Sequence, residues 1–268
     1  MIIKEIKMKN KIFAIILCLI FALPLCGCKK KGDLSSWIRE DVLFKYQLLN
    51  GFCAPCGDKS PHIAIIDLTE KGMQEEVLIV PEFINGYPVK HIRTNALVWG
   101  GYGQINSEIL KRFYVIYHQN FYDDDVRSFF NGYDVDSNTY SNPKLERVII
   151  RYGQLDETPT LGVAYDRKLN LSGELVWGIP HQTNISYWSN FDDNEVEPYW
   201  VDDFDYGGYI KYIPESPTRD GYIFDGWYKE KECINKWDFE KDVLPEELLD
   251  EDGNTVFQET KLFAKWTV

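Results

Sequence analysis

The sequence predicts a mainly β or α+β protein, in which two folded parts follow an N-terminal leader. Three apolar strand-like segments align at Val77, Phe113 and Val148, spaced by 36 and then 35 positions. Between Gly221 and Gly226, residues alternate in the two-residue period of a strand. Hydrophobic residues make up 44% of the chain and aromatic residues 15%. This composition can supply a packed core, so a disordered chain is not expected.

The first 28 residues have the pattern of an export signal. Four lysines precede an apolar run from Ile12 to Leu23, and Leu25-Cys26-Gly27-Cys28 follows. A short apolar run behind positive charge is typical of a secretory signal peptide, whereas a membrane-spanning helix needs roughly 20 apolar residues. The ending resembles a bacterial lipoprotein signal, which is cut before a cysteine that then receives lipid. This resemblance implies a signal peptide over residues 1–27 and lipid on Cys28, with a plain secretory peptide as the alternative.

The charge of the mature chain limits its partners. The whole chain has 29 Lys and Arg against 42 Asp and Glu, and the leader removes four Lys and one Glu, which leaves 25 against 41, or -16. Nucleic-acid binding needs a basic surface, so this class of partner is not expected. Residues 28–44 begin with three lysines after Cys28 and are expected to form a lipidated tether at the extracellular face of the membrane.

Three cysteines remain besides the leader and the lipidated residue. Cys53-Ala-Pro-Cys56 could form a local disulfide or stay idle, and these alternatives are favoured over a thioredoxin-like redox site because loop residues follow Cys56. A zinc site is disfavoured because His62 adds at most one ligand. Cys233 is expected to be a lone buried thiol.

Residues 45–182 contain repeated apolar segments. The first leads through an Asn85-Gly86 turn, and a strand that recurs at near-constant spacing is typical of stacked units. The residues around Val80-Pro81, Asn85-Gly86 and Pro88-Val89 resemble the leucine-rich repeats of BspA-like surface proteins. The resemblance implies a short, irregular leucine-rich-repeat solenoid of three strands, with the segment up to Pro180 capping one end.

Residues 183–268 carry a second resemblance. Their motifs are Pro214-Glu-Ser-Pro217, Gly221-Tyr-Ile-Phe-Asp-Gly-Trp-Tyr228, Trp237-Asp-Phe239 and Lys261-Leu-Phe-Ala-Lys-Trp266. This pattern is similar to the Listeria–Bacteroides repeat, the B-repeat of internalin-type surface proteins. The chain departs from it by Phe263 in place of the usual Tyr and by a longer insert before the closing strand. The resemblance implies a small β-grasp-like domain on an extracellular bacterial protein, without catalytic residues.

Several side-chain groups in these two parts allow more than one interpretation. The aromatic residues of the last part could form a sugar-stacking platform, but core packing is favoured; they are Tyr222, Phe224, Trp227, Trp237, Phe239 and Trp266. A calcium loop starting at Asp134 lacks the Gly and Glu that it needs, since Thr139 and Leu145 stand there. The acidic runs at 123–125, 192–193 and 202–205 could bind calcium weakly, but a solvated surface is favoured. Pro245 could start a short helix, before a turn at residues 252–254.

The sequence shows no recognisable catalytic set. The four histidines are dispersed, and neither a Gly-rich phosphate loop nor a G-x-S-x-G elbow occurs. We therefore expect a lipid-anchored bacterial surface protein, without enzymatic activity, cofactor or metal, that recognises a host protein, another cell or a glycan. Alternatives are a passive envelope spacer, a carbohydrate-binding module and, with less support, a Cys-x-x-Cys redox accessory protein. An exposed aromatic stripe would favour glycan binding, and a helix after Cys56 would favour redox chemistry.

Overall fold

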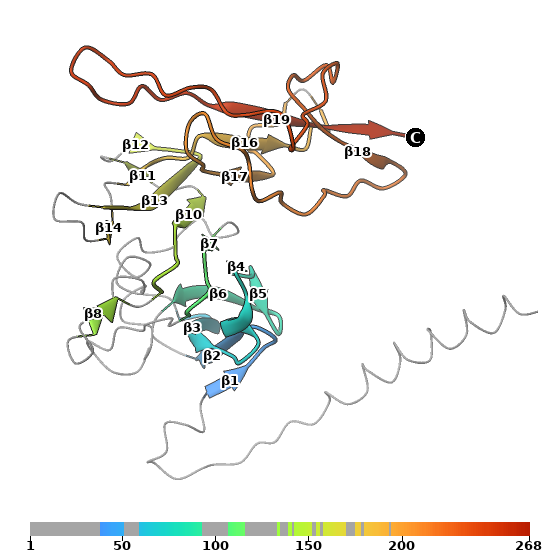
Figure 1. The fold of residues 1–268 in the computed structure, drawn as a ribbon. Helices are drawn as coiled ribbons and strands as arrows, with labels where there is room; N and C mark the ends of the chain where they lie inside the picture. Colours follow the sequence, from blue (N-terminus) through green and yellow to red (C-terminus); the bar gives the residue numbers. More distant parts are fainter. Residues whose placement is uncertain are drawn as a thin grey trace, which may run out of the picture. The chain divides into compact units, whose positions relative to one another are not determined.

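The structure is a computed structural model (Figure 1) that describes residues 38–50, 59–92, 107–115, 133–134, 139–140, 142–151, 154–155, 158–169, 175–177, 180–192 and 194–268. Backbone contacts divide the chain into two compact units, residues 1–36 and 37–268. The predicted signal peptide, residues 1–27, lies outside the described residues.

The first sheet has the strand order β1-β2-β3-β6-β5. Its strands are β1 (Ile38–Glu40), β2 (Phe44–Leu49), β3 (His62–Leu68), β5 (Phe83–Ile84) and β6 (Tyr87–Ile92). Strands β3 and β6 are parallel, and the other neighbours are antiparallel. The predicted turn between β5 and β6 is confirmed, because Asn85 and Gly86 have φ angles of 51° and 79°. Since β1 lies within residues 28–44, the sheet begins inside the segment assigned to the tether.

The second sheet contains the repeated segments and has the order β14-β13-β10-β7-β4, with β15 also paired to β13. Its strands are β4 (Val77–Ile79), β7 (Arg112–Val115), β10 (Arg147–Arg151), β13 (Gly162–Leu169), β14 (Leu175–Trp177) and β15 (His181–Gln182). Strands β4, β7 and β10 are parallel, and the pairing aligns Leu78 with Phe113 and Phe113 with Val148. The period is therefore 35 residues in both steps, and the alignment at Val77 was wrong by one residue. Antiparallel β13 closes the β10 side of the stack, as the sequence predicts.

The backbone hydrogen bonds repeat with the same period. The amides of Lys111 and Arg112 both donate to the carbonyl oxygen of Glu76, over 2.8 and 3.2 Å. One repeat later, the amides of Glu146 and Arg147 both donate to the carbonyl oxygen of Lys111, at the same two distances. The chain thus enters each parallel strand in the same conformation, which is what stacked repeats require.

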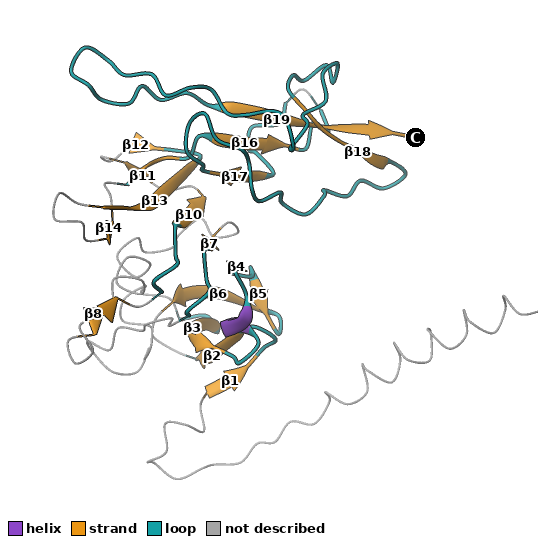
Figure 2. Cartoon of the chain, viewed as in Figure 1, coloured by secondary structure: helices purple, strands orange, loops and turns teal. Residues whose placement is uncertain are grey.

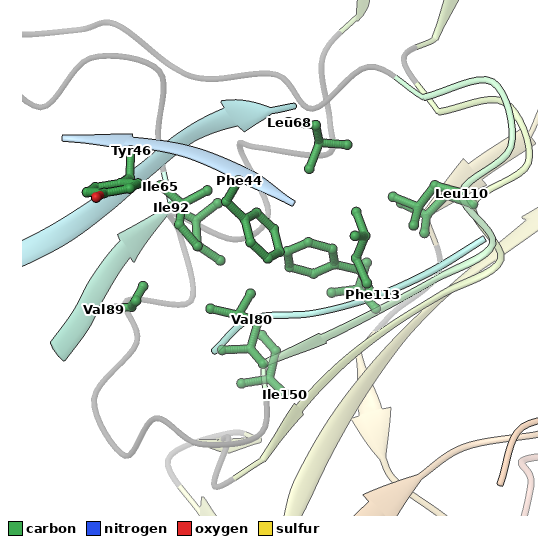
Figure 3. Close-up of a cluster of buried hydrophobic side chains, with 14 of the residues drawn as sticks. Phe44, Tyr46, Ile65, Leu68, Val80, Val89, Ile92, Leu110, Phe113 and Ile150 are labelled. Atoms are coloured by element: carbon green, nitrogen blue, oxygen red, sulfur yellow. The ribbon is translucent and has the colours of Figure 1, made fainter. Parts of the chain in front are cut away.

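Two hydrophobic cores lie on opposite faces of this second sheet. Side chains alternate between the faces of a strand, so Phe113 of β7 points into the first core and Tyr114 into the second. The first core lies between the two sheets described above, and Figure 3 shows the rings of Phe44 and Phe113 pointing toward one another within it. All four residues of β7 are buried, as is typical of a parallel strand covered on both faces.

The second core is covered by a sheet from the last part of the chain, in the order β17-β16-β19-β18. Its strands are β16 (Ile185–Trp188), β17 (Trp200–Asp202), β18 (Ile223–Tyr228) and β19 (Thr260–Thr267). Strands β16 and β19 are parallel, whereas the other pairs are antiparallel. The two predicted strands are thus confirmed, but Gly226 lies inside β18 at a bulge, with φ at 130°. A Cβ atom there would lie 2.5 Å from Cε of Lys236.

The remaining elements are small. Two hairpins pair β8 (Tyr133–Asp134) with β9 (Thr139–Tyr140) and β11 (Gln154–Leu155) with β12 (Thr158–Pro159). Figure 2 shows strands and loops, with one 3-10 helix at Gly72–Gln74 among the described residues. The helix expected at Pro245 is wrong, because the chain there forms an extended arm that turns back at Gly253. The mainly β prediction is confirmed.

The burial of Phe113 in β7 predicts how strongly the first core depends on this ring. Phe113→Ala removes a fully buried ring and should lower the free energy of unfolding by about 3–5 kcal/mol. Phe83→Ala is the matched control, because its ring is exposed, and it should change stability by less than about 0.5 kcal/mol. Urea unfolding measures both values. Equal losses of stability in the two variants would contradict the burial of Phe113 and the exposure of Phe83.

Candidate recognition surface

Of the cysteines singled out in the sequence, Cys233 is the one that the described residues include. Cys28, Cys53 and Cys56 lie outside these residues. Cys233 is a free thiol, as expected, but it is partly buried instead of buried. Partial burial raises the pKa of the Cys233 thiol, and a hydrogen bond from Asn190 opposes that rise. The thiolate is therefore disfavoured at Cys233.

The histidines that the structure describes, His62, His91 and His181, contact neighbouring residues of the fold. His62 and His91 are buried on neighbouring strands, with ring centroids 5.4 Å apart, and Nδ1 of His62 lies 2.7 Å from the carbonyl oxygen of Ser60. Nε2 of His181 lies 3.2 Å from Oδ2 of Asp203. In the part of the chain that the structure describes, no three His, Cys, Asp or Glu side chains gather in a way that could hold a metal ion.

The acidic run at 202–205 contradicts its predicted exposure. Asp202 and Asp203 are both buried, whereas Asp205 is exposed. Arg112 of β7 is also buried, and its guanidinium donates to Oδ1 of Asp202 and to the carbonyl oxygen of Asp203, the latter over 2.7 Å. The hydroxyl of Tyr114 donates to Oδ2 of Asp202 over 3.0 Å and accepts a 2.7 Å bond from Nε of Arg112. These residues form a closed buried ion network.

The next repeat extends this network toward solvent. Arg147 occupies the position in β10 that Arg112 occupies in β7, because the two residues are register partners. Its Nε donates to Oδ2 of Asp203 over 3.1 Å, and its other end pairs with the exposed Asp205. Two arginines from one repeat position thus bind three acids that follow or end β17.

Electrostatics keep the central arginine charged. Burial disfavours the charged form of Arg112 and so lowers its pKa. The charge of Asp202 and the interactions with Tyr114 outweigh this effect, so the pKa of Arg112 is raised above its ordinary range. Burial also raises the pKa of Tyr114, and the nearby Asp202 adds to that rise, so the phenol stays protonated. Arg112 therefore remains a cation and Tyr114 a hydrogen-bond donor to Asp202, the donor roles that the network requires.

Sequence reasoning missed this network, although a signal was present. Arg112 and Arg147 stand at the same place in two apolar repeats, where neighbouring positions are buried. A charge kept at an inward repeat position needs an opposite partner, and two adjacent acids elsewhere could supply it. The repeated arginine therefore predicts an acidic partner, but the sequence does not show which acidic run supplies it.

The aromatic residues divide between the core and the surface. Trp227 and Trp237 are buried, and Phe224, Phe239 and Trp266 pack partly buried against the second core; the core prediction is therefore confirmed for Trp227 and Trp237. Tyr222 differs, since 41% of its surface is exposed. It belongs to a surface group that we call the aromatic patch, in which Phe191 and Tyr222 are exposed and Arg219, Phe224 and Trp266 are partly buried.

The patch is built around one arginine and one tryptophan. Cζ of Arg219 lies 4.2 Å from the ring centroid of Tyr222 and 5.4 Å from that of Phe191. The ring of Trp266 lies 5.3 Å from Phe191 and 5.8 Å from Phe224. Phe191 is 41% exposed, like Tyr222, so both rings reach solvent while their neighbours hold them in place. Contacts of this kind add about 0.5–1 kcal/mol each at exposed sites.

The loop that presents Phe191 is firmly held. The carboxylate of Glu195 accepts hydrogen bonds from the backbone amides of Ser189 and Asn190, over 3.1 and 2.8 Å. The side-chain amide of Asn190 donates to the carbonyl oxygen of Ala264 over 3.1 Å, and the indole of Trp266 donates to that of Ser189 over 2.7 Å. These hydrogen bonds fix the backbone that presents Phe191.

A comparison with protein families identifies part of the chain. The family model of the Listeria-Bacteroides repeat domain matches residues 186–249. The match begins in β16, includes β17 and β18, and ends at Leu249, before β19. The C-terminal part of the chain therefore contains a repeat of this family, which is typical of bacterial surface proteins. Within the described ranges, the chain has no helix with the length and apolar character needed to cross a bilayer.

The fold should be sensitive to the loss of one partner of the buried ion network. Arg112→Met leaves Asp202 buried and uncompensated, so the free energy of unfolding should fall by about 3–5 kcal/mol. Combining it with Asp202→Leu should recover much of that loss, because the unpaired charge is then gone. Lys241→Met is the control, since its pair with Asp238 is exposed, and it should have no measurable effect. A small loss in Arg112→Met, below about 1 kcal/mol, would show that the network does not hold the fold.

Proposed function

We propose that this protein is a lipid-anchored bacterial cell-surface protein with a non-catalytic role in recognition or adhesion. The observation that carries the proposal is the Listeria-Bacteroides repeat at residues 186–249, because that family is typical of surface proteins. The leader pattern that ends at Cys28 supports the same location, on the extracellular face of the cell membrane.

The repeated strands support a binding scaffold in the first part of the protein. Strands β4, β7 and β10 stack in parallel with a constant period of 35 residues, and residues 45–182 resemble BspA-like leucine-rich repeats. Parallel strands buried on both faces form a rigid support. We infer that this stack is a short, irregular leucine-rich-repeat domain, which holds the C-terminal repeat through the Arg112 network.

The aromatic patch is the surface that suits recognition best. It combines two exposed rings, Phe191 and Tyr222, with the cation of Arg219, and hydrogen bonds hold the loop that presents Phe191. Aromatic residues and arginine are the side chains that most often dominate binding energy at interfaces. The mature chain is acidic overall, so a cationic aromatic spot differs in chemistry from its surroundings.

Carbohydrate binding is the second candidate, favoured by the clustering of aromatic rings at this patch. Sugars stack on free aromatic faces, but Phe191 already contacts both Trp266 and Arg219, and Tyr222 already contacts Arg219. These contacts reduce the ring area that a sugar could cover. We therefore place recognition of a protein ahead of recognition of a glycan, with a passive spacer as the outcome if neither binds.

The lipid anchor is tested by metabolic labelling of the producing cells with a radioactive fatty acid. The chain should take up label, and Cys28→Ser should remove it, because the thiol is the proposed attachment point. A Cys53→Ser chain is the matched control and should keep the label. Label that survives Cys28→Ser would contradict the anchor.

The recognition role is tested by probing arrays of glycans and extracellular-matrix proteins with the protein. We expect binding to at least one matrix protein, weakened about tenfold or more by Arg219→Ala with Tyr222→Ala, since Arg219 carries the charge of the patch and Tyr222 is one of its two exposed rings. Val196→Ala is a control at an exposed apolar residue outside the patch. Binding to neither class would favour the spacer, and patch-dependent binding to glycans alone would favour the carbohydrate alternative.

A further inference from the structure

A second exposed feature lies apart from the aromatic patch, and we call it the arm, residues 245–258. It leaves the C-terminal sheet and returns to it just before β19, as the orange-red loop at the upper left of Figure 1. Leu249 and Thr255 form an antiparallel bridge, and the amide of Val256 donates to the carbonyl oxygen of Leu248 over 2.7 Å. The arm is therefore a narrow two-stranded ribbon.

The base of the ribbon is fastened to the body. The amide of Gly207 donates to the carbonyl oxygen of Pro245 over 2.8 Å, and the amide of Gln258 donates to the hydroxyl of Tyr206 over 2.9 Å. The side chain of Gln258 also donates to the carbonyl oxygen of Glu246 over 2.8 Å, which ties the two strands together.

The tip of the ribbon is also ordered. The carboxylate of Asp250 accepts bonds from the amides of Asp252 and Asn254, over 3.0 and 2.8 Å. These bonds, that of Asn254 first, lower the pKa of Asp250. Gly253 completes the turn with φ at 83°, an angle that glycine adopts readily. The arm thus has a defined shape, although it covers no core.

Apolar side chains of the arm are exposed on both of its faces. Leu248 is 53% and Leu249 60% exposed, and Val256 and Phe257 are 41% and 44% exposed. Alternation along the strands places Leu249 with Phe257 on one face and Leu248 with Val256 on the other. A two-stranded ribbon gains little stability by itself, and clustered exposed apolar residues mark an interaction site.

The charge of the arm indicates the chemistry of its partner. Between residues 245 and 258 there are five acidic residues and no lysine or arginine. All five are exposed, and within the described residues none of their carboxylates makes an ion pair. A second copy of this acidic chain and an anionic membrane would both be repelled.

We propose that the arm is a docking element for a protein partner whose surface carries an apolar cleft bordered by lysine and arginine. The apolar side chains of the ribbon would fill the cleft, and the carboxylates would face the basic border. Such an interface combines apolar burial with charge steering, and a ribbon that is ordered in advance loses little entropy on binding. This surface is separate from the aromatic patch, so it can act whether or not the patch binds a ligand.

The test uses the full chain in a neutral detergent and a synthetic peptide of alternating leucine and lysine as the basic apolar probe. We expect the peptide to bind the protein, and a peptide of alternating leucine and glutamate to bind about tenfold more weakly or not at all. Leu249→Ser with Phe257→Ser keeps every charge of the arm, and Glu247→Gln with Asp252→Asn keeps every apolar group. Each pair should weaken binding of the basic peptide about tenfold or more.

Matched controls separate the arm from the general acidity of the chain. Val196→Ser with Ile234→Ser changes exposed apolar residues elsewhere, and Glu215→Gln with Glu232→Gln removes two other exposed acids. Both controls should bind within about twofold of the wild type. Unchanged urea midpoints in the arm variants show that the body remains folded.

The proposal is overturned if the arm variants bind the basic peptide as strongly as the wild type does. It is also overturned if the control variants, which change residues outside the arm, weaken peptide binding as much as the arm variants do. Arm-dependent self-association, measured by sedimentation, would also overturn it, because the occupant would then be a second copy. None of these results depends on the lipid label or on the matrix arrays, so the two proposals can fail separately.

Discussion

The buried pairing of Arg112 with Asp202 is the interaction on which the arrangement of this protein depends. It joins a strand of the parallel stack to the end of a strand in the C-terminal sheet, inside a region from which water is excluded. Apolar packing alone tolerates sliding of one surface over another, whereas a guanidinium with several fixed acceptors accepts one position. We infer that the network selects the position of the C-terminal repeat on the stack more than it adds to stability.

The stack itself shows why the repeat could be recognised from the sequence but its register could not. The period was visible because Phe113 and Val148 lie in similar apolar segments. Val77 and Leu78 are both apolar, and the strands are covered on both faces, so the alternation that normally distinguishes an inward from an outward residue is absent. The one-residue error at Val77 therefore follows from the double burial, and the backbone pairing with Phe113 resolves it in favour of Leu78.

The C-terminal part was predictable to a different degree. Its strands and glycines carry a specific pattern, so the closing strand and the turn at Gly253 could be located. The acidic residues could not be assigned, because Asp202 and Asp205 look alike in sequence and differ only through a partner 90 residues away. The helix expected at Pro245 failed for a related reason: local propensity favoured it, but hydrogen bonds to the body and across the ribbon hold the segment extended.

These features give the protein two distinct surfaces on one rigid support. A cationic aromatic patch lies on the C-terminal sheet, and an acidic apolar arm extends from it, so different ligands could be bound without a change in the core. Both surfaces are useful for recognition only if the support keeps them in fixed positions. That condition again rests on the ion network beneath the C-terminal sheet.

Hydrogen exchange in low concentrations of denaturant tests this account most directly, because it reports the opening free energy of each strand. If the network joins the stack and the C-terminal repeat, the backbone amides of β7 and β17 will exchange with the same free energy and the same dependence on denaturant. If β17 opens at a clearly lower free energy while β7 stays protected, the two parts are independent, and the ion pair does not organise the molecule.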